Sequence, residues 1–571
     1  MTRNQWLIAI AIVVAVCLVA FVCVAAVGGY LYFNQQQTPA LSTPGTDNTG
    51  SGTSPRQPTP TRKSVSRPPS SGGQVLNLAG ADPPTLDPHL TQDATSAEYI
   101  VEIYSGLVTL DPSLQIVPDL AENWDVSDDG LVYTFHLRAG ATFQNGKPVT
   151  AQDFKWSMER ACDPRTGSLV ADTYLGDVVG CRDKLRGKAD EVSGVRATDN
   201  STLEITIDAP KVYFLAKLTY PTAFVLDKDN VERGGRTWTD QPNGTGPFKL
   251  EEWVLGEKIV LVKNENYVLG PPKLAEVDYW LTGGSIMTRY ETGELDAVPV
   301  GLTDIDRVLD PTEPMNKELS VTSNMSIQYV GLNANQPPFD DANVRKAFAM
   351  ALDRKKLADV VLRKTTEAAD GVVPPAMPDY DNAALQSIPF DPDQAKQLIA
   401  ASKYGSVDDL PELTLHVSGG GGAAPRTVEA VTQMWEDNLG VEVAIEQTEW
   451  AIFLQDVSRR PNPYQFYMLG WIADYPDPQN FLDILFHSES LDNHSSYSNP
   501  EVDSLLEEAR TEQDEAQRFQ TYYKVEQMLV EDVAWIPLWY GKDYWLTKPY
   551  VKGMIYPPTI IPKLRYVSIE R

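Results

Sequence analysis

The strongest constraint on this chain is an uninterrupted apolar run from Trp6 to Val27. As a helix the run is roughly 33 Å long, which is enough to cross the hydrocarbon core of a bilayer. Arg3 precedes it and the next basic residue is Arg56, so the positive-inside tendency places the N-terminus in the cytoplasm. The sequence therefore predicts a membrane anchor in residues 1–33 and an extracytoplasmic body held at the cell membrane.

Two other fates of the N-terminal segment stay open at this point. A cleaved signal peptide usually has a shorter apolar core, of about 7–15 residues. Lipoprotein processing at Cys23 would tether the chain through lipid, although Val22 is bulky where such sites have a small residue. All three fates export the rest of the chain.

Residues 34–73 are dominated by Ser, Thr, Pro and Gly and have almost nothing to bury, which predicts a disordered linker. The remainder, 74–571, is long enough for more than one core, and a hydrophobic content of 42% is that of a globular protein. The net charge of −30 argues against a nucleic-acid partner, because phosphate contacts need clustered Lys and Arg.

Only two cysteines, Cys162 and Cys181, follow the apolar run. An even pair outside the cytosol predicts a disulfide, with two free thiols as the alternative. Closing a loop of this length stabilises the fold by about 3 kcal/mol in the chain-entropy model.

Strand and helix patterns are interleaved throughout the body. Residues 132–140 and 200–208 alternate apolar and polar side chains as strands do, and residues 534–540 predict a buried strand. This mixture predicts an α/β protein with more than one sheet.

Helix ends are marked by capping residues. Thr150 and Asp153 form a capping box at the start of one helix. Another is predicted to have Asp391 as N-cap and Pro392 at its first position, and to stop at Gly405.

Catalytic signatures are missing from the sequence. Residues 140–148, GATFQNGKP, have the wrong glycine spacing for a phosphate loop, and Pro148 stands where Ser or Thr is needed. Neither H-E-x-x-H nor G-x-S-x-G occurs. The sequence thus predicts a protein that is not an enzyme and uses no cofactor.

One polar segment, residues 487–500, contains four possible metal ligands, His487, Glu489, Asp492 and His494. Its composition is that of a surface loop, and no metal site is predicted there.

Several segments, taken in order, carry a resemblance to a known family. They are PPTLDP (83–88), AENWDVSDDGLVYTFHLRAGATFQNGKPVTAQDF (121–154), GTGPFKL (244–250), NANQPPFDDANVRKAFAMALDR (333–354) and GWIADYPDPQNFLD (470–483). The chain resembles the extracytoplasmic solute-binding proteins of ABC importers for dipeptides, oligopeptides and nickel, over residues 74–571.

The resemblance implies an α/β fold of the type II periplasmic-binding class, in which two lobes close on a ligand. One lobe would combine residues 74–92, 244–328 and 546–571, an additional domain would span 93–243, and the second lobe would span 329–545. It also implies a monomer that delivers peptides to the permease subunits of an ABC transporter.

In the peptide-binding members, the aspartate of a W-x-x-D segment contacts the ligand's N-terminal ammonium, and Asp474 stands in that position here. Trp471 and Trp450 match pocket tryptophans, and Tyr475 is a further candidate. A turn or capping acid is the alternative for Asp474 and the favoured reading of Asp477.

Arg426 follows a glycine run and begins a probable helix, so a guanidinium and a helix N-terminus are available for a ligand carboxylate. A flexible loop with a solvated Arg is the alternative. Receptors for nickel chelates or oligosaccharides share the fold, and a tethered hydrolase or a sensor remains as a function of another class.

Overall fold

The computed structural model describes residues 74–571. The predicted anchor (1–33) and linker (34–73) lie outside the described residues. Within 74–571, no helix has both the length and the apolar character needed to cross a membrane.

The largest element is an 11-stranded mixed sheet with the order β15-β14-β16-β12-β17-β11-β1-β10-β9-β8, in which β13 also pairs with β17. Its strands are β1 (Val75–Ala79), β8 (Phe248–Val254), β9 (Lys258–Lys263), β10 (Glu276–Trp280), β11 (Ala297–Pro299), β12 (Leu319–Leu332), β13 (Glu367–Ala368), β14 (Leu413–Ser418), β15 (Val443–Thr448), β16 (Phe466–Ile472) and β17 (Trp535–Thr547).

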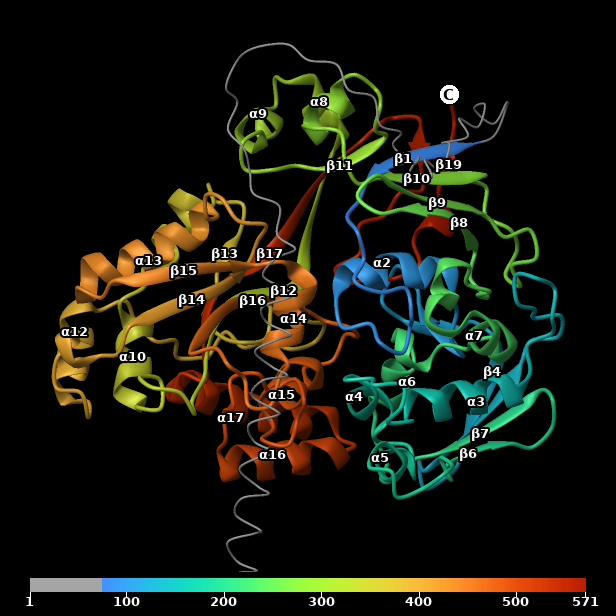
Figure 1. Cartoon of the computed structure of the whole chain (residues 1–571), viewed down its shortest axis with the longest axis horizontal. Coiled ribbons are helices and arrows are strands. Elements are labelled where there is room, and N and C mark those ends of the chain that lie inside the picture. Colours follow the sequence, from blue (N-terminus) through green and yellow to red (C-terminus); the bar gives the residue numbers. More distant parts are fainter. Residues whose placement is uncertain (1–73) are drawn as a thin grey trace, which may run out of the picture. The chain divides into compact units, whose positions relative to one another are not determined.

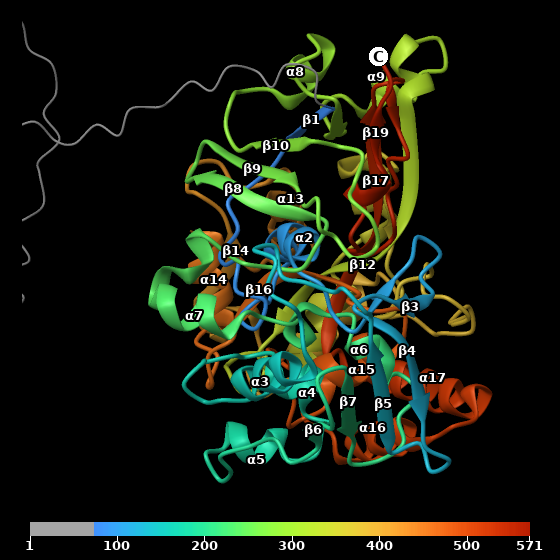
Figure 2. The ribbon, with the colours of Figure 1, turned by 90° about the vertical axis from the view of Figure 1, so that its right-hand side faces the viewer.

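Two long antiparallel strands, β12 and β17, join the two ends of this sheet (Figures 1 and 2). The first half of β12 pairs with the part of β17 that continues to β11. The second half pairs with β16 and with the start of β17. The register shifts between Ser323 and Ile327, where the chain passes from one end of the sheet to the other. The two lobes therefore share their longest strands.

A separate antiparallel sheet has the order β4-β5-β7-β6. Its strands are β4 (Ala121–Val126), β5 (Val132–Leu137), β6 (Val195–Ala197) and β7 (Thr202–Thr206), and two strand pairs complete the set: β2 (Val108–Leu110) with β3 (Ile116–Pro118), and β18 (Val551–Lys552) with β19 (Ser568–Ile569). The strands expected at 132–140 and 200–208 are thus present, slightly shorter than the patterns.

The helices are α2 (Ala94–Ile103), α3 (Ala151–Ala161), α4 (Ala171–Leu175), α5 (Cys181–Leu185), α6 (Phe214–Lys217), α7 (Lys228–Gly234), α8 (Ile286–Glu291), α9 (Ile305–Leu309), α10 (Ala342–Met350), α11 (Arg354–Lys356), α12 (Pro392–Ala401), α13 (Arg426–Leu439), α14 (Trp450–Val457), α15 (Gln479–Phe486), α16 (Pro500–Thr511) and α17 (Glu515–Asp532).

Helix α3 packs on the small sheet and starts at the predicted capping box. The Thr150 side chain accepts from the backbone N–H of Asp153, and the Asp153 side chain accepts from the backbone N–H of Thr150. The predicted disulfide is also present: Cys162, just after α3, is bonded to Cys181 at the start of α5. Both cysteines are buried in the core of this sheet, so the bond fastens α5 to α3.

The expected stop at Gly405 is wrong. Helix α12 has Asp391 as N-cap and Pro392 in its first turn, as predicted, but ends at Ala401. The hydroxyl of Ser402 donates to the carbonyl of Ile399 at 2.7 Å and so competes with continuation of the helix. Gly405 lies beyond the end, in a turn with φ of 76°.

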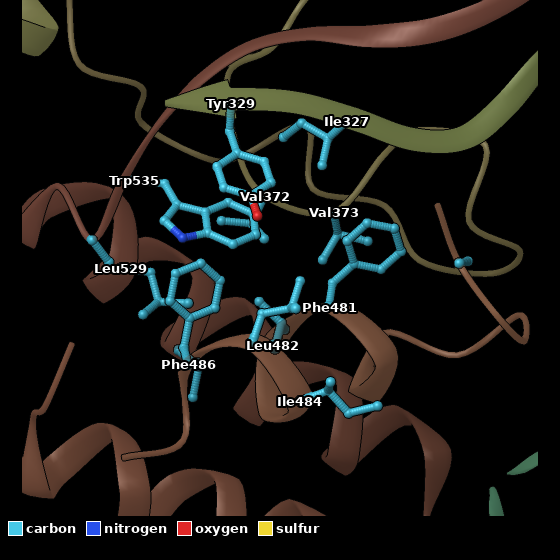
Figure 3. Close-up of a cluster of buried hydrophobic side chains, with 14 of the residues drawn as sticks. Ile327, Tyr329, Val372, Val373, Phe481, Leu482, Ile484, Phe486, Leu529 and Trp535 are labelled. Atoms are coloured by element: carbon cyan, nitrogen blue, oxygen red, sulfur yellow. The ribbon is translucent and has the colours of Figure 1, made fainter. Parts of the chain in front are cut away.

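Aromatic residues dominate the core beneath β12. The rings of Tyr329 and Trp535 stack with centroids 3.4 Å apart, and Phe481, Leu482 and Phe486 of α15 pack below them (Figure 3). This packing fixes α15, and with it the segment 470–478 that leads into the helix.

Candidate ligand-binding site

A cavity of about 550 Å³ lies against the part of the large sheet formed by β12, β16 and β17. Its walls come from distant segments: the start of α2, helix α4, strands β12 and β16, and the starts of α13 and α14. Residues of α4 and of the start of α2 thus face residues of β16 and of the starts of α13 and α14 across it.

Two predicted tryptophans form part of the wall. Trp471 is near the end of β16, and its indole N–H donates to the Asn480 side chain at 3.0 Å. Trp450 is the first residue of α14, and Glu449 caps that helix by accepting from the N–H groups of Ala451 and Ile452. The indole N–H of Trp450 is buried with no hydrogen-bond partner among the described residues. It is therefore available to a ligand.

Asp474 lines the same cavity and is half-buried. Its Oδ2 atom accepts from the Tyr174 hydroxyl and, at 3.1 Å, from the Asn480 side-chain amide. Its Oδ1 atom has no hydrogen-bond partner within the described part of the chain. Burial raises the pKa of Asp474 to about 7, although the bonds from Tyr174 and Asn480 act to lower it. The arrangement offers one open carboxylate oxygen to a donor.

Tyr174 and Tyr220 also line the cavity. Their rings stack with centroids 3.7 Å apart, and the Tyr220 hydroxyl donates to the Thr91 carbonyl at 3.0 Å. Beside Tyr174, the Thr173 hydroxyl donates to Oδ2 of Asp492 at 2.8 Å. Two neighbouring residues of α4 therefore donate hydrogen bonds to two cavity carboxylates, Asp474 and Asp492.

Two more carboxylates, Asp492 and Asp93, line the cavity with Asp474. Burial raises the pKa of Asp492 to about 6, opposed by the Thr173 bond and by Arg460. Asp93 is the N-cap of α2, and its Oδ1 accepts from the N–H of Ser96 at 3.0 Å. Among the described residues, those lining the cavity include no Lys and no Arg.

The other two predicted site residues do not line this cavity. Tyr475 is fully buried in the core beneath β12, and its hydroxyl donates to the Gln479 side chain. Arg426 is exposed as the first residue of α13, while its neighbours Pro425 and Thr427 line the cavity. The Arg426 side chain is therefore close to the cavity along the chain but is not one of its lining residues.

The remaining carboxylates of segment 470–483 are structural. Asp477 accepts from the N–H of Gln479 at 2.9 Å at the start of α15 and pairs with Arg518 at 2.8 Å. Asp483 forms a two-pronged pair with Arg510. Asp477 thus stabilises the turn that leads into α15, which is one of the two roles, turn or capping acid, favoured for it.

Sequence reasoning missed Tyr174, Tyr220 and Asp93 and gave Asp492 no part in binding. Segment 487–500 is not the plain surface loop expected from its composition, because Asn493 is fully buried and its side chain bonds to three backbone carbonyls. Across the described residues, no group of three His, Cys, Asp or Glu is placed to hold a metal.

The family model and the similar proteins that match this chain agree on its family. Residues 115–493 match the family model described as bacterial extracellular solute-binding proteins, family 5. The dipeptide-binding protein DppE of Bacillus subtilis is 31% identical, over 86% of this chain and 90% of its own. The periplasmic oligopeptide-binding protein OppA of Escherichia coli is 31% identical, over 83% and 88%.

Solved structures agree. OppA of Listeria monocytogenes bound to peptide superposes with a TM-score of 0.78 at 27% identity, covering 88% of this chain and 100% of that one. The murein tripeptide-binding protein MppA of Escherichia coli gives 0.79 at 28% identity, covering 88% and 99%. The unliganded open form of MppA gives only 0.62, at 29% identity over 87% and 98%. The lobes of this chain are therefore arranged less like that open form.

Proposed function

Because the chain belongs to the bacterial extracellular solute-binding proteins of family 5, we propose that it captures peptides between its lobes and delivers them to the permease of an ABC importer. The peptide is released unchanged, without covalent chemistry.

The observation that carries the proposal is the open oxygen of Asp474 in a cavity without Lys or Arg among its described lining residues. A peptide's terminal ammonium loses its water on entering such a cavity, which costs several kcal/mol unless a carboxylate receives it. Oδ2 accepts from Asn480 of the same segment, which orients the side chain before the ligand arrives, and from Tyr174 once the lobes are closed, so Oδ1 is left for the ammonium.

The rest of the peptide meets surfaces that tolerate many side chains. Trp471 and Trp450 offer ring faces and one free indole N–H. Arg426 at the start of α13 supplies a cation for the peptide's C-terminal carboxylate, provided the ligand extends past Pro425 and Thr427.

Lobe closure is the mechanism that we propose for capture. The lobes share β12 and β17, and the register shift between Ser323 and Ile327 marks the place where these strands can bend. Closing brings Tyr174 to Asp474 and Thr173 to Asp492, so the carboxylates that receive the ligand also hold the lobes together.

We further propose that the receptor is a monomer tethered on the extracytoplasmic face through residues 1–33, with the linker 34–73 spacing the body from the membrane. The division into 74–92, 244–328 and 546–571, then 93–243, then 329–545 is supported by the separate cores of the small sheet and of the second lobe. Helix α2 and residues 224–238, which this division assigns to the additional domain, pack instead in the core of the first lobe.

The test is calorimetric titration of the body, residues 74–571, with tri-alanine and with N-acetyl-tri-alanine. Asp474→Ala should weaken binding of the free tripeptide about a hundredfold or more, because an ammonium is left buried and unpaired. The acetylated peptide should lose much less. Asp393→Ala, an exposed acid in α12, is the control and should change neither. Equal losses for both peptides would remove Asp474 from amine recognition.

A further inference from the structure

We propose that the cavity selects peptides with a second positive charge, a Lys or Arg side chain, received by Asp492 together with Asp93. The inference rests on the proposed function, since it assumes that Asp474 takes the terminal ammonium. It assigns a second cation-binding position in the same cavity.

The three cavity carboxylates differ from other buried aspartates of this chain. Asp177 contacts Lys211 and Lys217, and Asp483 is paired with Arg510. Asp93, Asp474 and Asp492 have no ion-pair partner within the described residues, although they lie on three separate segments that converge on one cavity. No Lys or Arg among the described residues that line the cavity neutralises these three carboxylates.

Each of the two additional carboxylates has an oxygen to offer. Asp492 uses Oδ2 for the Thr173 hydroxyl and has no hydrogen bond to Oδ1 among the described residues. Asp93 is only 8% exposed; it uses Oδ1 to cap α2, and its Oδ2 is unpartnered in the described part of the chain. The start of α2 holds Asp93 in place, and Thr173 holds Asp492 in the closed arrangement.

The charged groups near Asp492 do not neutralise it. The guanidinium of Arg460 donates to the Ser490 carbonyl and makes no ion pair with Asp492. Asp172 adds negative charge near Asp492. His494, on the same wall, is neutral because burial and Arg460 lower its pKa to about 3. Nothing on these elements replaces a ligand cation.

One terminal ammonium can neutralise one carboxylate and leaves the buried Asp93 and the half-buried Asp492 without a cation. An ionised carboxylate that is removed from water without a cation is unfavourable, and the group otherwise takes up a proton. A basic side chain on the peptide relieves that cost, a neutral one leaves it, and an acidic one adds a further negative charge. The expected order of affinity is therefore basic, neutral, acidic.

The experiment uses calorimetric titration with tri-alanine derivatives in which one position carries Lys, Gln or Glu, each placed in turn at positions one, two and three. The wild-type body should bind the best Lys peptide about tenfold or more tightly than its Gln counterpart, and the Glu peptide most weakly. Asp492→Asn should bring the Lys and Gln peptides to within about threefold. Asp393→Asn, the matched surface control, should keep the wild-type ratio.

Equal affinities of wild-type protein for Lys and Gln peptides at every position would overturn the inference and leave the proposed function standing. Failure of all the peptides to bind would overturn the proposed function itself. A Lys preference that survives Asp492→Asn would remove that residue from the assignment. The wild-type series decides the charge preference even if the variant does not fold.

Discussion

Tyr174 donates a hydrogen bond to Oδ2 of Asp474 across the cavity, joining two residues 300 positions apart in the chain. Tyr174 belongs to α4, in the proposed additional domain, and Asp474 to the segment that follows β16. The carboxylate proposed to receive the ligand is therefore also a contact between the lobes.

The first prediction concerns this contact. Tyr174→Phe keeps the ring that stacks on Tyr220 and removes only the hydroxyl. A hydrogen bond to a charged group contributes about 1.5–3 kcal/mol, so peptide affinity should fall roughly tenfold or more, whatever the side chains of the peptide. Isothermal titration of tri-alanine measures the change.

Tyr220→Phe is the matched control, because the Tyr220 hydroxyl bonds to Thr91, which is on the same side of the cavity. Its affinity should stay near the wild-type value. Full affinity in Tyr174→Phe would show that the hydroxyl has no part in closure.

The second prediction is that pH controls closure of the ligand-free protein. Burial raises the pKa of Asp474 to about 7 and of Asp492 to about 6, against an ordinary aspartate value of about 3.9 in an open, solvated cavity. Between about pH 3.9 and pH 7 the closed form therefore binds more protons than the open form. Closure is favoured as pH falls through this range and opposed as pH rises towards 7. Small-angle scattering should give a smaller radius of gyration at pH 5 than at pH 8.

The double variant Asp474→Asn, Asp492→Asn serves as the control for this titration. Without the two carboxyl groups, the radius of gyration should no longer change between pH 5 and pH 8. A wild-type protein with one radius at both values would contradict the prediction.

Local structural features were predicted correctly from the sequence in most cases. The capping box at Thr150, the N-cap at Asp391 and the strand at 132–137 depend on residues a few positions apart, and all are present. The stop at Gly405 was wrong because the Ser402 hydroxyl ends the helix earlier through its own bond to Ile399. A glycine marks where a helix can end, and competing side chains decide whether it ends sooner.

The cavity was only partly predictable for a different reason. Trp471 and Asp474 carry a local motif and do line it, whereas Tyr174 and Tyr220 reach it through contacts between remote segments. Nothing in the sequence around Tyr174 shows that it lines the cavity, whereas Tyr475, which is buried in the same core cluster, does not. Only the packing of α4 against the segment that follows β16 separates the two tyrosines.

The third prediction is that the disulfide affects stability and leaves binding intact. Cys162 and Cys181 are buried in the core of the small sheet, and neither lines the cavity. Replacing both with Ala opens a crosslink of sequence separation 19 and should lower the free energy of unfolding by about 3 kcal/mol. Urea denaturation followed by circular dichroism measures the loss.

Peptide affinity of the folded double variant at 25 °C is the companion measurement. It should match the wild-type value, because Tyr174 contacts Asp474 through its own hydroxyl and neither cysteine lines the cavity. A folded variant with greatly weakened binding would place the disulfide in the binding machinery.

The fourth prediction concerns a buried charge cluster in the additional domain. Asp177 accepts from Lys211 at 2.6 Å and from Lys217 at 2.7 Å, and all three side chains are almost fully buried. Burial acts to raise the pKa of Asp177, but the two ammonium groups hold it well below its ordinary value. Asp177→Asn leaves Lys217 without its carboxylate and should destabilise the fold by about 3–5 kcal/mol at pH 7.

Urea unfolding at pH 7 and at pH 3 tests both the size and the sign of this effect. The depressed pKa means that the contribution of Asp177 is complete above its unfolded value of about 3.9 and is lost as pH falls below it. The gap between wild type and Asp177→Asn should therefore be smaller at pH 3 than at pH 7. Asp199→Asn, an exposed turn residue, is the control and should stay within about 0.5 kcal/mol of wild type at pH 7. A gap that widens in acid would contradict the assignment of Asp177 as the ionised partner of the two lysines.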